Sequence, residues 1–125
     1  MSSITQTQRI LTDDSLTSWV DAFLFDRRSS SRAPGTQRFY AVKLGGFITW
    51  CASQQVTTID QVTSNDIRRF LVWLGETDHT PGGVHAYYRA IKAFFHWLSD
   101  ELDNPNITRI IDKVKTPFVS EKPLQ

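Results

Sequence analysis

Apolar side chains recur along this chain about every 3.6 residues, and no long stretch alternates apolar with polar positions. The first spacing is typical of a helix that buries one face, and the second would be typical of a strand. The pattern predicts four main helices, over about 15–28, 36–54, 63–75 and 80–102, and a short fifth helix over about 107–114. The predicted fold class is therefore all-α, a bundle of four main helices plus a short C-terminal helix.

Residues suited to capping stand at the predicted helix starts. Asp14 or Ser15 can cap the first helix, and Thr36 can cap the second. Thr63, followed three residues later by Asp66, has the spacing of a capping box at the start of the third helix. These local signals support the helix boundaries that the apolar stripes predict.

Three times a phenylalanine precedes a tryptophan by three residues, in FITW at 47–50, FLVW at 70–73 and FFHW at 94–97. Such rings could stack on nucleic-acid bases or be buried between helices. The phenylalanines fall on or beside the apolar stripes, and the tryptophans lie toward the stripe edges. Because burying each ring stabilises a fold by roughly 1.5–3 kcal/mol, we expect a small bundle to keep most of them in its core.

The chain has 125 residues, enough for one domain with its own core. We expect a flexible N-terminal tail over 1–14, a helical domain over 15–114 and a proline-containing exit over 115–125. No apolar run approaches the length of a membrane span, and the polar first fifteen residues hold no targeting signal. A cytoplasmic protein is the expectation, and the single cysteine, Cys51, is expected to be a small core residue.

Charge is unevenly distributed, although the net charge is only +1. Residues 27–59 hold five arginines and lysines and no acid, and residues 79–99 hold Arg89, Lys92 and three histidines and again no acid. The outward faces of the second and fourth helices are small and basic; they are predicted to carry Arg38, Val42, Gly45 and Thr49, and His85, Ala86, Arg89, Ala90, Ala93 and His96. Both segments are candidates for facing an anion. His85 and His96 are interpreted as solvated side chains or phosphate donors.

Motifs for catalysis are not found. No histidine pair has the spacing of a metal-binding helix, and neither a glycine-rich phosphate loop nor a G-x-S-x-G sequence occurs. We therefore expect no active site, no metal site and no cofactor.

Two adjacent glycines, Gly45 and Gly46, stand in the middle of the second predicted helix, where each costs roughly 1 kcal/mol relative to alanine. Close approach of another backbone would compensate. For Gly46 we expect helix packing. For Gly45, on the outward face, helix packing and a nucleic-acid backbone remain equal alternatives.

The order of several motifs resembles a known family. The motifs are the threonine-started helix with Tyr40, Leu44, Phe47 and Trp50, the sequence VTSNDIRRFL at 62–71, the fourth helix ending in FFHWL at 94–98, and then Asn104-Pro105. Together, over about residues 15–124, they resemble the N-terminal core-binding domain of tyrosine recombinases, the phage integrases and Xer-type enzymes.

The resemblance implies a SAM-like helical bundle that forms one half of a clamp around double-stranded DNA, in DNA integration or recombination. The family's catalytic residues lie in a second domain, so this chain is not expected to be an enzyme, and its tyrosines are not expected to be nucleophiles. Residues 115–125 look like the linker into that catalytic domain. The implied partners are double-stranded DNA, the protein's own catalytic domain and other recombinase protomers on DNA, in a bacterial, archaeal or phage-encoded protein without membrane contact.

By the same resemblance, the N-terminal halves of the second and fourth helices face DNA. The corresponding positions here are Thr36, Gln37, Arg38 and Phe39, and Gly82, Gly83, His85, Ala86 and Arg89. Phosphate contacts are expected from Arg32, Arg38, Lys43, Arg89 and Lys92, and base contacts from Gln37, Arg38, His85 or Arg89. The family usually has serine or threonine where this chain has Gly82-Gly83.

Two other functions are alternatives to DNA clamping. In the first, the small faces of the second and fourth helices bind a helix of another protein, with no DNA role. In the second, the chain is a helix-turn-helix regulator, which is disfavoured because no compact three-helix pattern with a recognition helix stands out. Salt dependence of DNA binding separates the clamp from the protein-interaction module.

Overall fold

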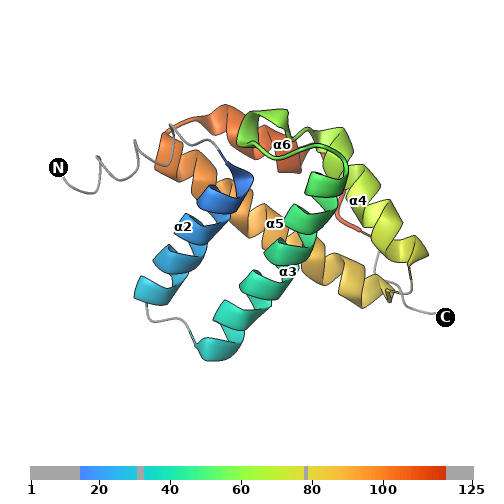
Figure 1. The fold of residues 1–125 in the computed structure, drawn as a ribbon, viewed down its shortest axis with the longest axis horizontal. Coiled ribbons are helices and arrows are strands. Elements are labelled where there is room, and N and C mark those ends of the chain that lie inside the picture. Colours follow the sequence, from blue (N-terminus) through green and yellow to red (C-terminus); the bar gives the residue numbers. More distant parts are fainter. Residues whose placement is uncertain (1–14, 31–32, 78, 118–125) are drawn as a thin grey trace. The chain divides into compact units, whose positions relative to one another are not determined.

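The computed structural model describes residues 15–30, 33–77 and 79–117. Regular structure within these ranges is helical, apart from one isolated β-bridge between Ser15 and Thr58. In chain order the elements are α2 (Leu16–Ser29), α3 (Pro34–Ser53), η1 (Ile59–Gln61), α4 (Ser64–Glu76), α5 (Pro81–Leu102), η2 (Pro105–Ile107) and α6 (Thr108–Asp112) (Figure 1). The all-α prediction, with four main helices and a short C-terminal helix, is confirmed.

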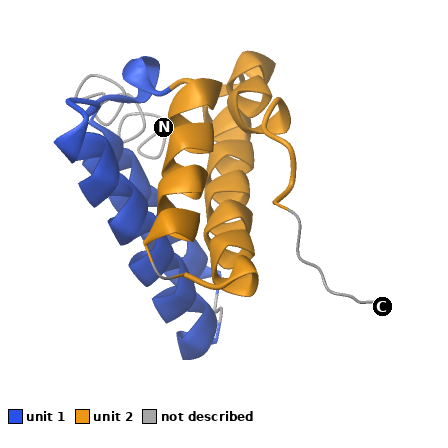
Figure 2. Cartoon of the chain, turned by 90° about the vertical axis from the view of Figure 1, so that its right-hand side faces the viewer, with its two compact units in different colours: residues 1–62 blue, residues 63–125 orange. Residues whose placement is uncertain are grey.

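The chain is divided into two compact units, unit 1 with residues 1–62 and unit 2 with residues 63–125 (Figure 2). The predicted tail, 1–14, and the exit beyond residue 117 lie outside the described residues. The predicted domain bounds stay a prediction.

In unit 1, α2 begins where Ser15 caps it. The Ser15 hydroxyl oxygen accepts a hydrogen bond from the Ser18 N–H at 3.3 Å, and the Leu16 N–H donates to the Thr57 carbonyl at 2.9 Å. Helices α2 and α3 pack against each other, and the Phe23 ring meets the Tyr40 ring edge-on with 5.1 Å between centroids. The two helices bury Leu16, Trp19, Val20, Phe23, Leu44, Phe47, Trp50 and Cys51. Cys51 is a core residue, as predicted.

Helix α3 starts earlier than the sequence pattern predicted. Its first residue is Pro34, and Ala33 is the N-cap without a side-chain hydrogen bond. The prediction that Thr36 caps this helix is therefore wrong. Proline suits the first helical position because its ring presets φ and its missing N–H has no partner there anyway, so Thr36 lies inside the first turn.

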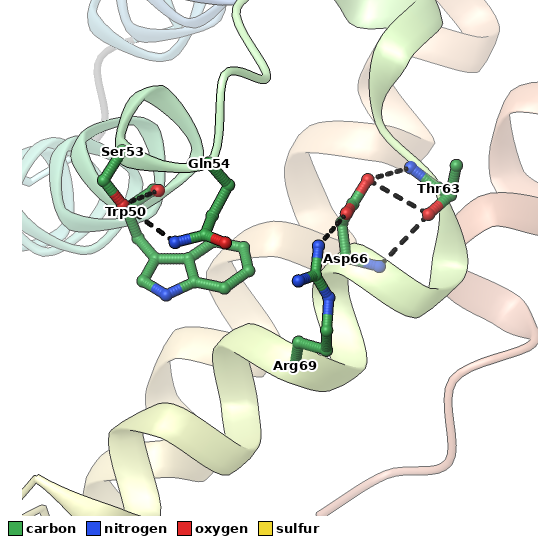
Figure 3. Close-up of polar contacts among 6 residues, drawn as sticks. All are labelled: Trp50, Ser53, Gln54, Thr63, Asp66 and Arg69. Carbon is green, nitrogen blue, oxygen red and sulfur yellow. Dashed lines mark hydrogen bonds and ion pairs between the residues drawn. The ribbon is translucent and has the colours of Figure 1, made fainter.

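In unit 2, α4 begins with the predicted capping box. The Asp66 carboxylate accepts hydrogen bonds from the Thr63 N–H at 2.9 Å and the Thr63 hydroxyl at 3.0 Å, and from Arg69 Nη2 at 2.7 Å; the Asp66 N–H donates back to Thr63 Oγ1 at 3.1 Å (Figure 3). Burial tends to raise the pKa of Asp66, but the bonds from Arg69 and Thr63 outweigh it and hold that pKa below its ordinary value of 3.8. Helix α4 ends at Glu76, one residue beyond the predicted stop at Gly75.

Helix α5 has the predicted bounds, but it buries a wider face than the predicted stripe. Ala90, predicted on the outward face, is buried together with Val84, Tyr88, Ile91 and Phe94. The assignment of Ala90 to an outward small face is therefore wrong. After a left-handed residue at Asp103, the 3-10 turn η2 leads into the five-residue α6, which is shorter than the expected fifth helix over 107–114.

The Phe–Trp pairs are mainly core, as predicted. Phe47, Phe70, Phe94 and Phe95 have no exposed surface. The tryptophans differ: Trp50 is buried and Trp97 half-buried, whereas Trp73 keeps 43% of its surface exposed. Figure 3 also shows the end of α3, where the Ser53 hydroxyl donates to the Trp50 carbonyl at 2.6 Å.

Candidate nucleic-acid interface

Among the described residues, no side chain caps the first turn of α3 in unit 1. Its N-cap residue has no side-chain hydrogen bond, and no acid lies in the first turn. The positive end of the helix dipole therefore has no carboxylate of the same turn beside it. Thr36 is exposed in this turn, beside Gln37, which is half-buried.

Helices α2 and α3 form a groove of about 490 Å³ next to this turn. Its lining residues are Asp21, Leu24, Arg28, Pro34, Gln37, Arg38 and Ala41. The two arginines come from different helices, and both are exposed. The Arg28 guanidinium lies 6.0 Å from the centre of the Phe25 ring, and Arg38 has no ion pair among the described residues.

Arg28 is a cation of this groove that was not predicted as a site residue. The sequence did indicate it as a possible anion-binding residue, because it lies at the start of the acid-free segment 27–59. What the sequence pattern did not indicate is that the last turn of α2 faces the first turns of α3. The neighbouring Arg27 is less available to bind an anion, because its Nη2 pairs with Asp26 at 2.8 Å and its guanidinium lies 5.3 Å from the Phe23 ring centre.

The other predicted residues of α3 are partly engaged within unit 1. Phe39 is half-buried and meets the Tyr40 ring edge-on at 5.5 Å, and Lys43 is half-buried and has an intramolecular partner. Gly45 has open space where a Cβ would stand: apart from its chain neighbours and the backbone of its own helix, no atom lies within 4 Å. Arg32 lies outside the described residues.

The start of α5 in unit 2 is capped differently from that of α3. Thr80 Oγ1 accepts a hydrogen bond from the Gly83 N–H at 3.0 Å, and no acid lies in the first turn. A Cβ at Gly83 would stand 3.3 Å from that oxygen, closer than most real Cβ contacts, whereas a Cβ at Gly82 would stand 4.0 Å away. The glycine at 83 thus allows the Thr80 cap, and the hydroxyl at this helix start is supplied by Thr80.

Further along α5, Arg89 and Lys92 are both exposed and three residues apart, so they lie on the same side of the helix. His85 and Ala86 are half-buried, and the His85 ring lies 6.0 Å from that of Tyr88. His96, interpreted from the sequence as solvated or a phosphate donor, is exposed but bonds to Asp112 Oδ1 through Nε2 at 3.0 Å. The exposed cations Arg89 and Lys92 therefore lie near the middle of α5.

The structure brings the predicted residues together in two groups. In unit 1, Gln37 and Arg38 share a groove with Arg28. In unit 2, the predicted residues Gly82, Gly83, His85, Ala86, Arg89 and Lys92 lie between the first turn and the middle of α5. Neither group contains the elements of a metal site: the described residues include no cluster of three or more His, Cys, Asp or Glu side chains. Among the helices of the described ranges, none is both long and apolar enough to cross a membrane.

Comparison with known proteins identifies one related family. The family model described as phage integrase, N-terminal SAM-like domain, matches residues 19–104. No curated protein and no solved structure shows significant similarity to the chain. The matched region includes the two groups of residues described above.

Proposed function

The chain belongs to the family of phage integrase N-terminal SAM-like domains. From this membership we propose that it binds double-stranded DNA at the core site on which a site-specific recombinase acts. A recombinase-related role follows from the family itself, and the matched domain is not the family's catalytic domain. In the proposed role the chain clamps duplex DNA during integration or recombination. Strand cleavage is left to the catalytic domain of the full-length protein.

One observation carries the proposal: in each unit an acid-free segment, residues 27–59 or 79–99, has exposed cations on its helices. In unit 1 the cations are Arg28 and Arg38 at the α2–α3 groove, and in unit 2 they are Arg89 and Lys92 on α5. A planar guanidinium matches two phosphate oxygens at once. These side chains are suited to the backbone contacts that hold a protein in register on DNA.

Base contacts are assigned to the polar side chains beside those cations. Gln37 lines the same groove as Arg38, and His85 lies one turn before Arg89. A glutamine can bond adenine through two atoms in the major groove, and an arginine can do the same with guanine. The outward face of α3 around Val42, Gly45 and Thr49 is small, which allows this helix to approach a groove closely.

The experiment is a titration of the 125-residue chain with labelled duplex, read by fluorescence anisotropy at several salt concentrations. Each phosphate contact adds roughly 0.9 to the slope of log affinity against log salt. Arg38→Ala together with Arg89→Ala should therefore flatten the slope by about two units. The same pair changed to glutamate should remove most affinity while leaving the melting temperature nearly intact, because both side chains are exposed.

Arg109→Glu is the matched control. Arg109 is an exposed arginine on α6, outside both acid-free segments. If Arg109→Glu weakens binding as much as the double change, the assigned surface is wrong. If the wild-type chain shows no salt-dependent duplex binding even at low salt, the DNA proposal itself is wrong and the protein-interaction module is favoured.

A further inference from the structure

Unit 2 contains an open groove between α4 and the segment that follows α6. Three hydrogen bonds tie the end of α6 and this segment to the longer helices: Ser64 Oγ donates to the Ile110 carbonyl at 2.7 Å, Arg68 Nη2 to the Lys113 carbonyl at 3.0 Å, and Thr116 Oγ1 to Tyr88 Oη at 3.2 Å. Residues 113–117 are thereby held as one wall of a groove of about 480 Å³. The groove is preformed, which lowers the entropy cost of binding.

The groove has an apolar floor and a basic rim. Its apolar lining residues are Leu71, Val72, Val84, Val114 and Pro117, and its charged ones are Arg68, Lys113 and Lys115. No carboxylate is among these described lining residues. Val72, which lines the groove, is 59% exposed, so the groove presents apolar surface to solvent. Exposed apolar surface with a charged rim is typical of an interaction site.

We propose that this groove binds a polypeptide segment of matching chemistry, an amphipathic helix with a row of apolar side chains flanked by carboxylates. The apolar row would cover Val72 and the floor, and the carboxylates would meet Lys113, Lys115 and the free donors of Arg68. Docking of an apolar helix face in a groove is a common mode of peptide recognition. The rim charge selects acidic partners over basic ones.

A polypeptide fits this groove better than a nucleic acid does. A phosphate backbone could pair with the three cations, but its charged oxygens would then lie against the aliphatic floor. A peptide can pair its carboxylates with the cations and cover the floor with apolar side chains. None of the lining residues is among those assigned above to DNA. The inference therefore stands independently of the DNA proposal.

The test uses two designed helical peptides of about 15 residues with the same leucine row, one flanked by glutamates and the other by lysines. Binding to the 125-residue chain is measured by fluorescence anisotropy, and the site is located by amide shifts in NMR spectra. The glutamate peptide should bind, the lysine peptide should bind at least about tenfold more weakly, and the shifts should cluster at residues 68–72 and 113–117. Val72→Gln and Lys115→Gln should each weaken binding about fivefold or more.

Arg109→Gln is the control, because this exposed arginine does not line the groove. Thermal melts confirm that each variant is folded. The Arg38→Glu, Arg89→Glu double variant should bind the glutamate peptide as the wild type does, so failure of the DNA proposal can be told apart from failure of this one. Equal binding of both peptides, no binding at millimolar peptide, shifts elsewhere, or displacement of the peptide by duplex DNA would each overturn the inference.

Discussion

Protonation of one carboxylate at the start of α4 should change the stability of the fold. Asp66 is buried, and its two oxygens accept three hydrogen bonds, two from Thr63 and one from Arg69 (Figure 3). Asp66→Asn keeps the size of this side chain but removes its charge and replaces one acceptor oxygen by an NH₂ group. The variant therefore imitates protonated Asp66.

The magnitude follows from the partners that the carboxylate loses. A hydrogen bond to a charged group contributes about 1.5–3 kcal/mol and a neutral one about 0.5–1.5. Losing a capping interaction costs typically about 1 kcal/mol. The Arg69 ion pair adds little, because half of the Arg69 side chain is exposed. We expect Asp66→Asn to lower the free energy of unfolding at neutral pH by about 2 kcal/mol, or the melting temperature by about 8–16 °C.

The pH dependence gives the sharper test. Because the pKa of Asp66 is lower in the folded chain than its ordinary 3.8, the charged carboxylate stabilises the fold fully above that value. This stability is lost as the pH falls through the lower, folded pKa. The difference between wild type and Asp66→Asn should therefore be largest near neutral pH and shrink toward zero in acid, where both side chains are uncharged.

Chemical denaturation of both proteins between neutral pH and about pH 3 measures this difference. Other carboxylates titrate in both proteins and cancel. Asp112→Asn is the matched control: Asp112 bonds to His96, but 49% of its side chain is exposed, so a change below about 1 kcal/mol is expected. A difference for Asp66→Asn that stays constant across the pH range would refute the assignment of the stability to the charged cap.

Three further predictions concern the core, the helix interior and the chemistry. Phe47→Ala and Phe95→Ala each remove a ring with no exposed surface, so thermal and denaturant melts should show a loss of about 3–5 kcal/mol; reduced duplex affinity at unchanged stability would mean that these rings contact DNA. Gly45→Ala should raise the free energy of unfolding by about 0.5–1 kcal/mol, because a Cβ there meets nothing within 4 Å; a lower melting temperature would contradict this. When the 125-residue chain is incubated with supercoiled plasmid, it should neither relax the plasmid nor become covalently attached to it. A covalent DNA adduct through any of its three tyrosines would contradict the proposal that strand cleavage belongs to another domain.

The outcome for the helices shows which features short-range chemistry can predict. The caps at Ser15, Thr63 and Thr80 are interactions with residues three positions away, so their residue types and spacing are visible in the sequence. The wrong prediction for the start of α3 also concerned neighbouring residues: the preference of Pro34 for the first helical turn outweighed that of Thr36 for the N-cap position. The helical repeat likewise placed the phenylalanines of the Phe–Trp pairs in the core.

Periodicity did not predict how wide each buried face is. The burial of Ala90, and the contrast between buried Trp50 and exposed Trp73, depend on which neighbours pack against each helix. The lining of the two grooves likewise depends on which segments pack together. Arg28 joins Gln37 and Arg38 only because α2 packs against α3, and the wall at residues 113–117 depends on hydrogen bonds such as that from Arg68 to Lys113, 45 positions apart. The sequence by itself thus determined the helices and the caps at Ser15 and Thr63, because these arise from residues within one or two turns, and it shows the acid-free segments directly. Only the tertiary structure decided which side chains share a groove, because that depends on contacts between segments far apart in the chain.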